Sequence, residues 1–222
     1  MPEGHTIHRL AEDGQERFGG RAVRAASPQG KFSDGAALID KQVMSGAEAH
    51  GKHLFLGFEG AGWVHVHLGL YGKFTFGTGP VPAPVGQVRL RLVTEAEAEA
   101  EAGAGTGSQA GAGGHFADLR GPTRCELITD VEKQAVEDRL GPDPLRKDSD
   151  PEQAWSRISR SRTTIAALLM DQKIVAGVGN VYRAEVLFRH GIDPYRAGRD
   201  LSRVEWDELW ADLVELMHEG VR

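Results

Sequence analysis

The hydrophobic pattern of the chain changes near residue 129, and this change limits the folds that are possible. Before it, runs such as HLFLGFE, WVHVHLGLYGKFTFG and QVRLRLV alternate apolar and polar residues, which is typical of half-buried strands in an antiparallel sandwich or barrel. After it, segments such as DVEKQAVEDRLG and LSRVEWDELWADLVELMHEG have helical spacing. The pattern therefore predicts an α+β chain: a β-rich domain over residues 1–128, led by a helix that runs to about Phe18, and an all-helical domain over residues 129–222.

The composition excludes several classes of protein. Residues 95–114 are rich in Glu, Ala and Gly and lack the apolar side chains that would offset ordering, so we expect a low-complexity insertion there. Cys125 is the single cysteine, which excludes an internal disulfide framework and a site with several cysteine ligands. No apolar run is long enough to cross a bilayer and no signal peptide is visible, so we expect a cytoplasmic protein without a membrane partner.

The charge of the chain is unevenly distributed. The formal net charge is -6, yet residues 157–199 hold eight Lys and Arg against three Asp and Glu. A basic block of this kind is compatible with a nucleic-acid partner, and equally with a solvated surface of mixed charge. Charge alone therefore does not decide the function.

A glycine-containing turn, VAGVGN, leads into a helix predicted to begin at about Val181. Amide groups at a helix N-terminus, with Asn180 as the expected cap, would form an anion site. Lys173 and nearby arginines add positive charge, as contact with a phosphate backbone requires. The turn lacks the GK[ST] sequence and the leading strand of a nucleotide-binding loop.

The chain starts MPEG, and two interpretations of Pro2 are open. Proline and an acidic residue are common in the first turn of a helix. Removal of Met1 would instead leave Pro2 with a free secondary amine, which is a nucleophile.

Taken together, five segments resemble the formamidopyrimidine-DNA glycosylase / endonuclease VIII family. They are MPEG, HGKHLFLGF, VHVHLGLYGKF, GPDPL and IAALLMDQKIVAGVGNVYRAEVLFRHGIDP. The resemblance covers nearly the whole chain outside the insertion and is nearest to the endonuclease VIII-type enzymes of actinobacteria. It implies an N-terminal β-sandwich with a leading helix, a helix–two-turn–helix domain, and a monomer that binds damaged double-stranded DNA and associates with the nucleoid when bound.

The reaction that this resemblance implies is base excision repair by a bifunctional DNA glycosylase and AP lyase, with oxidised pyrimidines as the expected substrates. Pro2 would attack C1′ of the deoxyribose and form an iminium ion, which leads to β,δ-elimination. Glu3 would protonate the sugar ring oxygen and move protons in later steps. Lys52, in HGKHL, matches the lysine that holds a phosphate beside the lesion. No cofactor is needed, because the amine supplies the covalent chemistry.

The family pattern also implies a set of DNA contacts. His67 and Asn180 match phosphate-side positions, and Lys173 lies in the same basic turn as Asn180. Leu70 and Tyr71 match loop residues that fill the gap left by an extruded nucleotide, where an apolar wedge and an aromatic ring replace the lost stacking. Arg120, in DLRGP, resembles an arginine that faces the estranged base.

The chain departs from the family at three places. Thr6 stands where a second glutamate is often found, and Gly121 and Pro122 follow Arg120 where the oxidised-guanine enzymes have phenylalanine. Family members usually end in a four-cysteine zinc finger, whereas this chain ends at Arg222 with only Cys125. We therefore expect no metal in this chain, and a catalytically impaired protein that binds damaged DNA is an alternative.

Two other readings use the same residues. Tautomerases have a terminal proline that acts as a base, although those chains are short and have no helical domain of this kind. A metal centre could use His50, His53, His65 and His67, since H-x-H in a strand places two imidazoles on one face. No carboxylate has an obvious spacing for such a centre.

Overall fold

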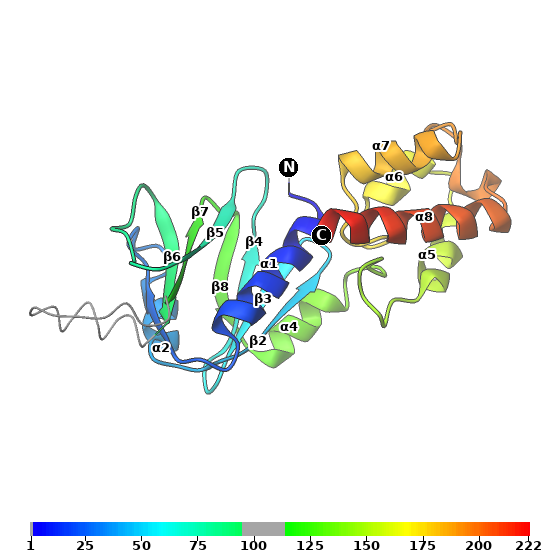
Figure 1. Cartoon of the computed structure of the whole chain (residues 1–222). Coiled ribbons are helices and arrows are strands. Elements are labelled where there is room, and N and C mark those ends of the chain that lie inside the picture. The colour runs from blue at the N-terminus through cyan, green and yellow to red at the C-terminus, as the bar shows by residue number, and fades with distance from the viewer. Residues whose placement is uncertain (1, 95–113) are drawn as a thin grey trace, which may run out of the picture. The chain divides into compact units, whose positions relative to one another are not determined.

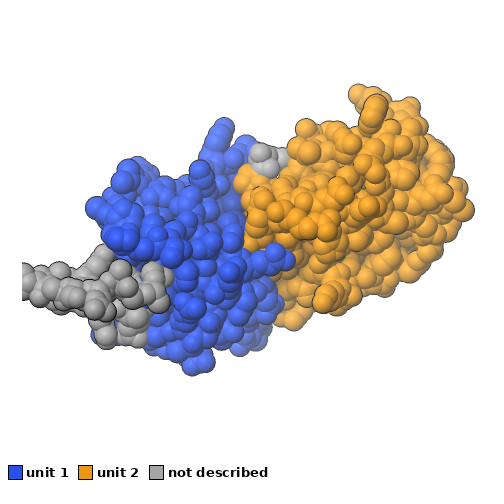
Figure 2. Space-filling view, in the orientation of Figure 1, with its two compact units in different colours: residues 1, 10–48, 54–133 blue, residues 2–9, 49–53, 134–222 orange. Residues whose placement is uncertain are grey.

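The computed structural model describes residues 2–94 and 114–222, which form two compact units (Figure 1). Unit 1 contains residues 10–48 and 54–133, and unit 2 contains residues 2–9, 49–53 and 134–222 (Figure 2). Unit 2 therefore combines the start of the chain and a short internal segment with the C-terminal part. The sequence-predicted domain boundary near residue 129 stays a prediction. Met1 and nearly all of the predicted insertion over residues 95–114 lie outside the described residues.

The described residues hold the following elements. The helices are α1 (Gly4–Phe18), α2 (Ser33–Ile39), α4 (Asp130–Glu137), α5 (Pro151–Ile158), α6 (Ile165–Met170), α7 (Asn180–Arg189), the short 3-10 helix η1 (Gly198–Asp200) and α8 (Arg203–Val221). The strands are β1 (Val23–Ala26), β2 (Met44–His50), β3 (His53–Phe58), β4 (Gly62–His67), β5 (Lys73–Thr78), β6 (Val88–Thr94), β7 (His115–Arg120) and β8 (Arg124–Ile128).

The strands form two four-stranded sheets, in the orders β1-β6-β7-β5 and β2-β3-β4-β8. The alternating pattern of the sequence is the cause, because it gives each strand one apolar face: Leu90 and Leu119 are fully buried partners across β6 and β7. This architecture confirms the predicted fold class, an α+β chain with an N-terminal β-sandwich and a leading helix. The sequence pattern missed β2, because MSGAEAH has no β-branched or aromatic residue.

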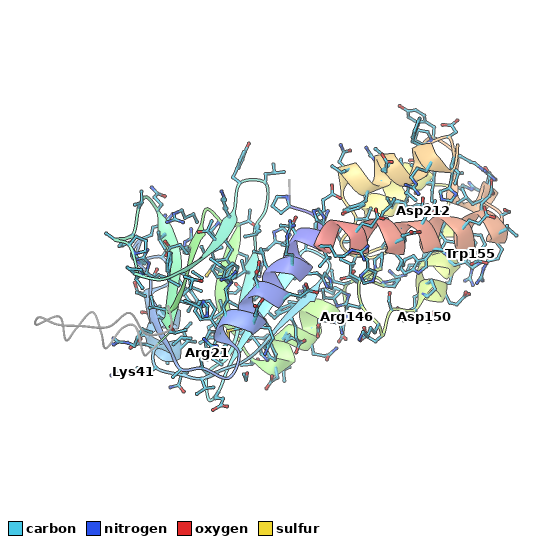
Figure 3. All side chains as sticks on the ribbon, in the orientation of Figure 1. Arg21, Lys41, Arg146, Asp150, Trp155 and Asp212 are labelled. Atoms are coloured by element: carbon cyan, nitrogen blue, oxygen red, sulfur yellow. The ribbon has the colours of Figure 1, made fainter. Side chains whose placement is uncertain are left out.

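Two helices of unit 2, α5 and α8, begin at residues whose side chains cap them. Asp150 accepts a hydrogen bond from the Glu152 amide at the start of α5, with Pro151 at the first helical position (Figure 3). Ser202 and Glu205 form a reciprocal capping box at the start of α8. The helices pack around one apolar core that contains Ile158, Leu169, Val186, Trp206, Leu209 and Leu213.

Helix α4 ends at Glu137, earlier than the sequence predicts. The chain then runs without helix to Gly141, whose amide donates to the Gln172 carbonyl oxygen over 2.9 Å. A Cβ atom at Gly141 would lie 2.3 Å from the Ile174 carbonyl oxygen, so only glycine fits against this segment. Among the described helices, none has the length and apolar character needed to cross a membrane.

Candidate active site

The carboxylate of Glu3 lies at the N-terminus of α7. It accepts hydrogen bonds from the amides of Gly179 (2.9 Å), Val181 (2.8 Å) and Tyr182 (3.4 Å), and the residue is only 1% exposed. Amides in the first turn of a helix have no partner within the helix and attract negative charge. Gly179, the N-cap of α7, and the first turn of the helix therefore fix both oxygens of the Glu3 carboxylate in place.

This arrangement corrects one sequence-based expectation. The N-cap of α7 is Gly179, and Asn180 is the first helical residue, so the expectation that Asn180 caps the helix is wrong. Asn180 is exposed, and its side-chain oxygen accepts a hydrogen bond from Arg183. The predicted anion site exists at the helix start, and the anion that it binds here is the chain's own Glu3.

Three glycines bring the segments of the site into backbone contact. The Gly4 amide donates to the Gly177 carbonyl oxygen over 2.8 Å. A Cβ atom at Gly177 would lie 3.4 Å from the Cα atoms of Gly4 and of Gly51. Gly177 and Gly51 have φ values of +88° and +57°, which favour glycine. Glu3 directly precedes Gly4, and Lys52 directly follows Gly51. The backbone contacts of these glycines therefore bring Glu3, Lys52 and the turn before α7 into one small region of unit 2.

Lys52 follows Gly51 in the turn between β2 and β3 and is half-buried. Burial lowers the pKa of its amine below the usual value, and the negative charge of Glu3 partly opposes this shift. Glu3 lies close enough to Lys52 for its charge to act on the lysine pKa, as expected from the backbone contacts between their segments. A buried lysine amine near a carboxylate is suited to bind a phosphate or to exchange protons.

Pro2 and Lys173 are the remaining candidate residues that belong to unit 2. Pro2 is half-buried and directly precedes Glu3, in the short extended segment before α1. Lys173 is exposed in the turn that follows α6, where its amide donates to Asp171 Oδ1 over 2.9 Å and its carbonyl oxygen accepts from Arg157. The backbone of Lys173 is therefore fixed through both its amide and its carbonyl group, while its side chain faces solvent.

The remaining predicted DNA contacts belong to unit 1. His67 ends β4, and its Nδ1 atom lies 2.9 Å from the Thr123 hydroxyl oxygen. Leu70 and Tyr71 lie in the turn between β4 and β5 and are 60% and 90% exposed. Large apolar side chains with such exposure at a loop tip are available for contact with another molecule.

Arg120, at the end of β7, is bound within its own sheet. Its guanidinium donates to Asp118 Oδ2 over 2.8 Å, to the Val85 carbonyl oxygen over 2.9 Å and to the Thr75 hydroxyl over 3.3 Å. About a third of the side chain is exposed. A role in facing a base stays a prediction for this residue.

Sequence reasoning missed two residues that shape the site, Gln172 and Asp143. The Gln172 amide group donates to the carbonyl oxygens of Met170 (3.0 Å) and Val178 (2.9 Å) and accepts from the Gly177 amide (3.0 Å). It therefore spans the turn that presents the Glu3-binding amides. Asp143 lies in the segment GPDPL, whose prolines suggested only an extended linker. The partners of Gln172 lie only two to six residues away, whereas Asp143 also binds the Gly51 amide and His8, which are distant in sequence. In neither case does the residue pattern show which groups the side chain binds.

The histidines considered for a metal centre do not form one. His65 is 1% exposed and stacks on Phe55 with a centroid distance of 4.9 Å, and burial lowers its pKa to about 4. Across residues 2–94 and 114–222, no three His, Cys, Asp or Glu side chains are grouped as metal ligands would be.

Family models match both parts of the chain. Residues 1–125 match the N-terminal domain of formamidopyrimidine-DNA glycosylase, and residues 140–222 match its H2TH domain. The proteins named Endonuclease 8 1 from Mycobacterium bovis and Mycobacterium tuberculosis are 52% identical to this chain over 223 residues, which is all of this chain and 78% of theirs.

Solved structures agree on the fold. A Lactococcus lactis Fpg (MutM), crystallised in complex with DNA that contains N7-benzyl-Fapy-dG, superposes with a TM-score of 0.75 at 19% identity, over 99% of this chain and 79% of that one. The MutM (Fpg) protein of Thermus thermophilus gives a TM-score of 0.70 at 25% identity, over 99% of this chain and 76% of that one. The sequence motifs, the sandwich and helical folds and the matched models agree, and the chain belongs to the formamidopyrimidine-DNA glycosylase / endonuclease VIII family of DNA repair glycosylases.

Proposed function

We propose that this protein is a bifunctional DNA glycosylase and AP lyase that uses Pro2 as its nucleophile. The observation that supports this most strongly is the fixed Glu3 carboxylate, buried beside α7 in the residue next to Pro2. Three backbone amides bind this one side chain, which is the preorganisation that an acid–base group needs.

The proposed reaction begins after Met1 has been removed. The Pro2 nitrogen attacks C1′, the bond from C1′ to the damaged base breaks, and the base leaves with the proton that the Pro2 nitrogen loses. Glu3, protonated by solvent before this step, gives its proton to the ring oxygen, so the ring opens to a cationic iminium ion on Pro2. The Glu3 carboxylate then takes up a C2′ proton as the 3′-phosphate leaves, and a second elimination expels the 5′-phosphate. Water hydrolyses the remaining iminium ion and frees Pro2.

Lys52 and the exposed groups are assigned to DNA binding in this proposal. The amine of Lys52 binds a phosphate beside the lesion, and Lys173 and Asn180 add contacts from the turn region before α7. In unit 1, Leu70 and Tyr71 fill the gap left by the extruded nucleotide, since their exposure leaves them free to stack. His67 and Arg120 contact the DNA from the ends of β4 and β7.

Oxidised pyrimidines are the proposed substrates, because the mycobacterial relatives at 52% identity are named as endonuclease 8 proteins. Gly121 and Pro122 after Arg120 support this choice over oxidised guanine. Comparing base release from duplexes with an oxidised pyrimidine and with 8-oxoguanine tests the preference. Faster release of the purine would contradict it.

Reductive trapping tests the function itself. The protein is incubated with a duplex that contains one abasic site, in the presence of borohydride, after intact mass analysis has shown that Met1 is absent. We expect a covalent complex that Pro2→Gly abolishes and that Glu3→Gln reduces strongly. Glu16→Gln is the matched control, because Glu16 is an exposed acid on α1, the helix that directly follows Glu3. Binding to the duplex without trapping would instead support a DNA-binding protein that lacks the chemistry.

A further inference from the structure

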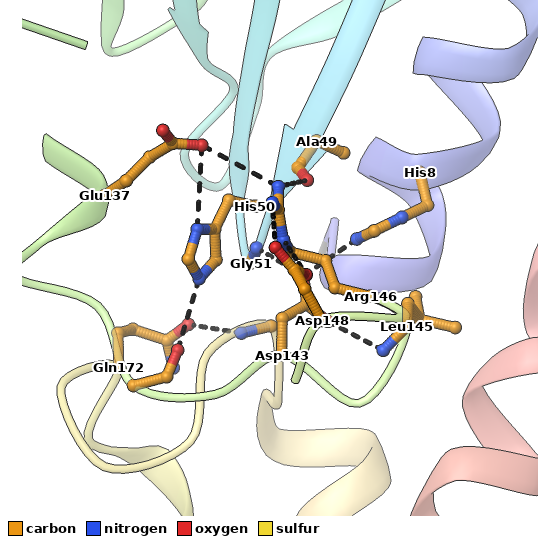
Figure 4. Close-up of polar contacts among 12 residues, drawn as sticks. His8, Ala49, His50, Gly51, Glu137, Asp143, Leu145, Arg146, Asp148 and Gln172 are labelled. Atoms are coloured by element: carbon orange, nitrogen blue, oxygen red, sulfur yellow. Dashed lines mark hydrogen bonds and ion pairs between the residues drawn. The ribbon is translucent and has the colours of Figure 1, made fainter. Parts of the chain in front are cut away.

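Asp143 is a buried carboxylate that the proposed reaction does not use. It lies between α4 and α5 and is 1% exposed. Its Oδ2 atom accepts from the Gly51 amide over 2.7 Å and lies 2.8 Å from His8 Nε2, and its Oδ1 atom accepts from the Leu145 amide over 2.9 Å (Figure 4). A buried charge is tolerated when its oxygens are bonded in this way.

The three donors come from different segments of unit 2, and two of these segments carry proposed active-site residues. Gly51 immediately precedes Lys52 in the turn between β2 and β3. His8 lies in the first turns of α1, the helix that follows Pro2 and Glu3. Leu145 belongs to the same linker as Asp143 and fixes the linker backbone around it.

We propose that Asp143 is a positioning residue for the lyase reaction, because it holds the turn that carries Lys52 to the helix that follows Pro2 and Glu3. This inference rests on the proposed function where activity is the readout. It adds a residue that touches neither substrate nor reacting atoms and acts through the Gly51 amide and the His8 imidazole.

Neighbouring contacts explain why this role falls to Asp143. Arg146 donates to the Ala49 carbonyl oxygen over 3.3 Å, and His50 Nε2 lies 3.2 Å from the Gly141 carbonyl oxygen. These contacts hold the residues before Gly51. Asp143 binds the last amide before Lys52, so its loss would free the part of the turn on which the lysine depends.

The charge state of Asp143 agrees with this role. Burial alone would raise the pKa of its carboxyl group, and the hydrogen bonds from His8, Leu145 and Gly51 outweigh burial and lower the pKa below its usual value. The carboxylate is therefore ionised near neutral pH and can accept from all of its donors at once.

Asp143→Asn tests the proposal, because it keeps the size of the side chain and replaces one acceptor oxygen with a donor. Asp148→Asn is the matched control: Asp148 lies on the same linker, its side chain is 68% exposed, and it pairs with Arg146. The first measurement is hydrogen exchange of the Gly51 amide by NMR, with the Gly4 amide as an internal reference, since Gly4 donates to Gly177 instead. We expect at least tenfold faster exchange at Gly51 in Asp143→Asn and an unchanged rate in Asp148→Asn.

The second measurement is single-turnover trapping with abasic-site DNA. If Asp143 only supports folding, its substitution would lower the amplitude of trapping, because less protein is folded, and would leave the rate constant of the folded fraction unchanged. We expect the rate constant to fall about tenfold in Asp143→Asn. In the Lys52→Ala background the same substitution should cost less than twofold, because the group that it positions is gone.

The outcomes separate this inference from the proposed function. Unchanged exchange at Gly51, or an unchanged rate constant in Asp143→Asn, would overturn the positioning role even if the wild type traps DNA. If the wild type does not trap DNA, the proposed function fails, and positioning of the turn is still decided by the exchange measurement. If Asp143→Asn does not fold, Asp143→Glu retains the charge and shifts its oxygens by one methylene, and it should show the same changes at smaller size.

Discussion

The two units bind their buried carboxylates in different ways. In unit 1, Asp118 is 3% exposed and lies between two guanidinium groups: Arg91 binds it through two hydrogen bonds of 2.7 and 2.8 Å, and Arg120 through one of 2.8 Å. In unit 2, Glu3 and Asp143 are bound mainly by backbone amides.

This difference follows from where the partners lie in the fold. Arg91 and Asp118 are opposite each other on β6 and β7, so their ion pair stabilises one sheet. Glu3 instead accepts from the Gly179 amide 176 residues away in sequence, and Asp143 from the Gly51 amide 92 residues away, so each connects distant segments. Amide donors at a fixed turn also cannot swing away as a long side chain can. We infer that the cation-bound carboxylate serves stability and the amide-bound carboxylates serve the site.

Asp118→Ala should have the largest effect on stability and little effect on chemistry. The substitution removes the carboxylate that both guanidinium groups bind, and breaking a buried pair costs about 3–5 kcal/mol. Urea unfolding should show this loss, whereas the trapping rate constant of the folded fraction should stay within about twofold. A large fall in that rate constant would contradict the division of roles between the units.

The pH dependence of stability should show a second large effect in unit 1. Burial keeps His65 neutral in the folded state, with a pKa of about 4, while the unfolded chain takes up a proton near pH 6.5. The stability that His65 contributes is therefore complete above pH 6.5 and is lost as the pH falls towards 4, by about 3 kcal/mol. His65→Phe keeps the ring on Phe55 and should flatten this part of the pH profile of unfolding. An unaltered profile would show that folding does not lower the pKa of His65.

Gly179→Ala should reverse the pattern of Asp118→Ala, with a large effect on chemistry. A Cβ atom at Gly179 would lie 2.4 Å from Glu3 Cδ, so the carboxylate must leave its amides. We expect the single-turnover rate to fall about 100-fold, as for the loss of an acid–base group. Gly46→Ala is the control, because a Cβ atom there meets only Gln15 Oε1 at 3.7 Å. A rate near that of the wild type in Gly179→Ala would show that the position of Glu3 is unimportant.

Ser202→Ala should have the smallest effect and serves as a reference for unit 2. It removes the capping box of α8, which is worth about 1 kcal/mol, and does not touch the site. Thermal unfolding should report this loss while the trapping rate is unchanged. A slower reaction would mean that general loosening of unit 2, rather than loss of specific contacts, lowers activity.

The sequence predicted most of the fold because its signals are local. Alternating apolar residues predicted strands in the segments that hold β3, β4, β5 and β6, and Asp150 followed by Pro151 is a local signal for the start of α5. It also identified the turn before α7 as an anion site, since glycines and a following helix are visible in the chain. The occupant of that site could not be predicted, because Glu3 is more than 170 residues away. The partners of Gln172 lie nearby in sequence and the Gly51 partner of Asp143 lies far away, and both were missed because any residue can offer a backbone amide or carbonyl group.

The site of covalent attachment tests the central claim most directly. Trapped complexes with abasic-site DNA are digested with protease and nuclease, and the peptide that carries the reduced sugar is sequenced by mass spectrometry. The proposed mechanism predicts that the sugar is attached to the nitrogen of an N-terminal Pro2. A sugar on Lys52 or another lysine, or a trapped protein that still carries Met1, would contradict it.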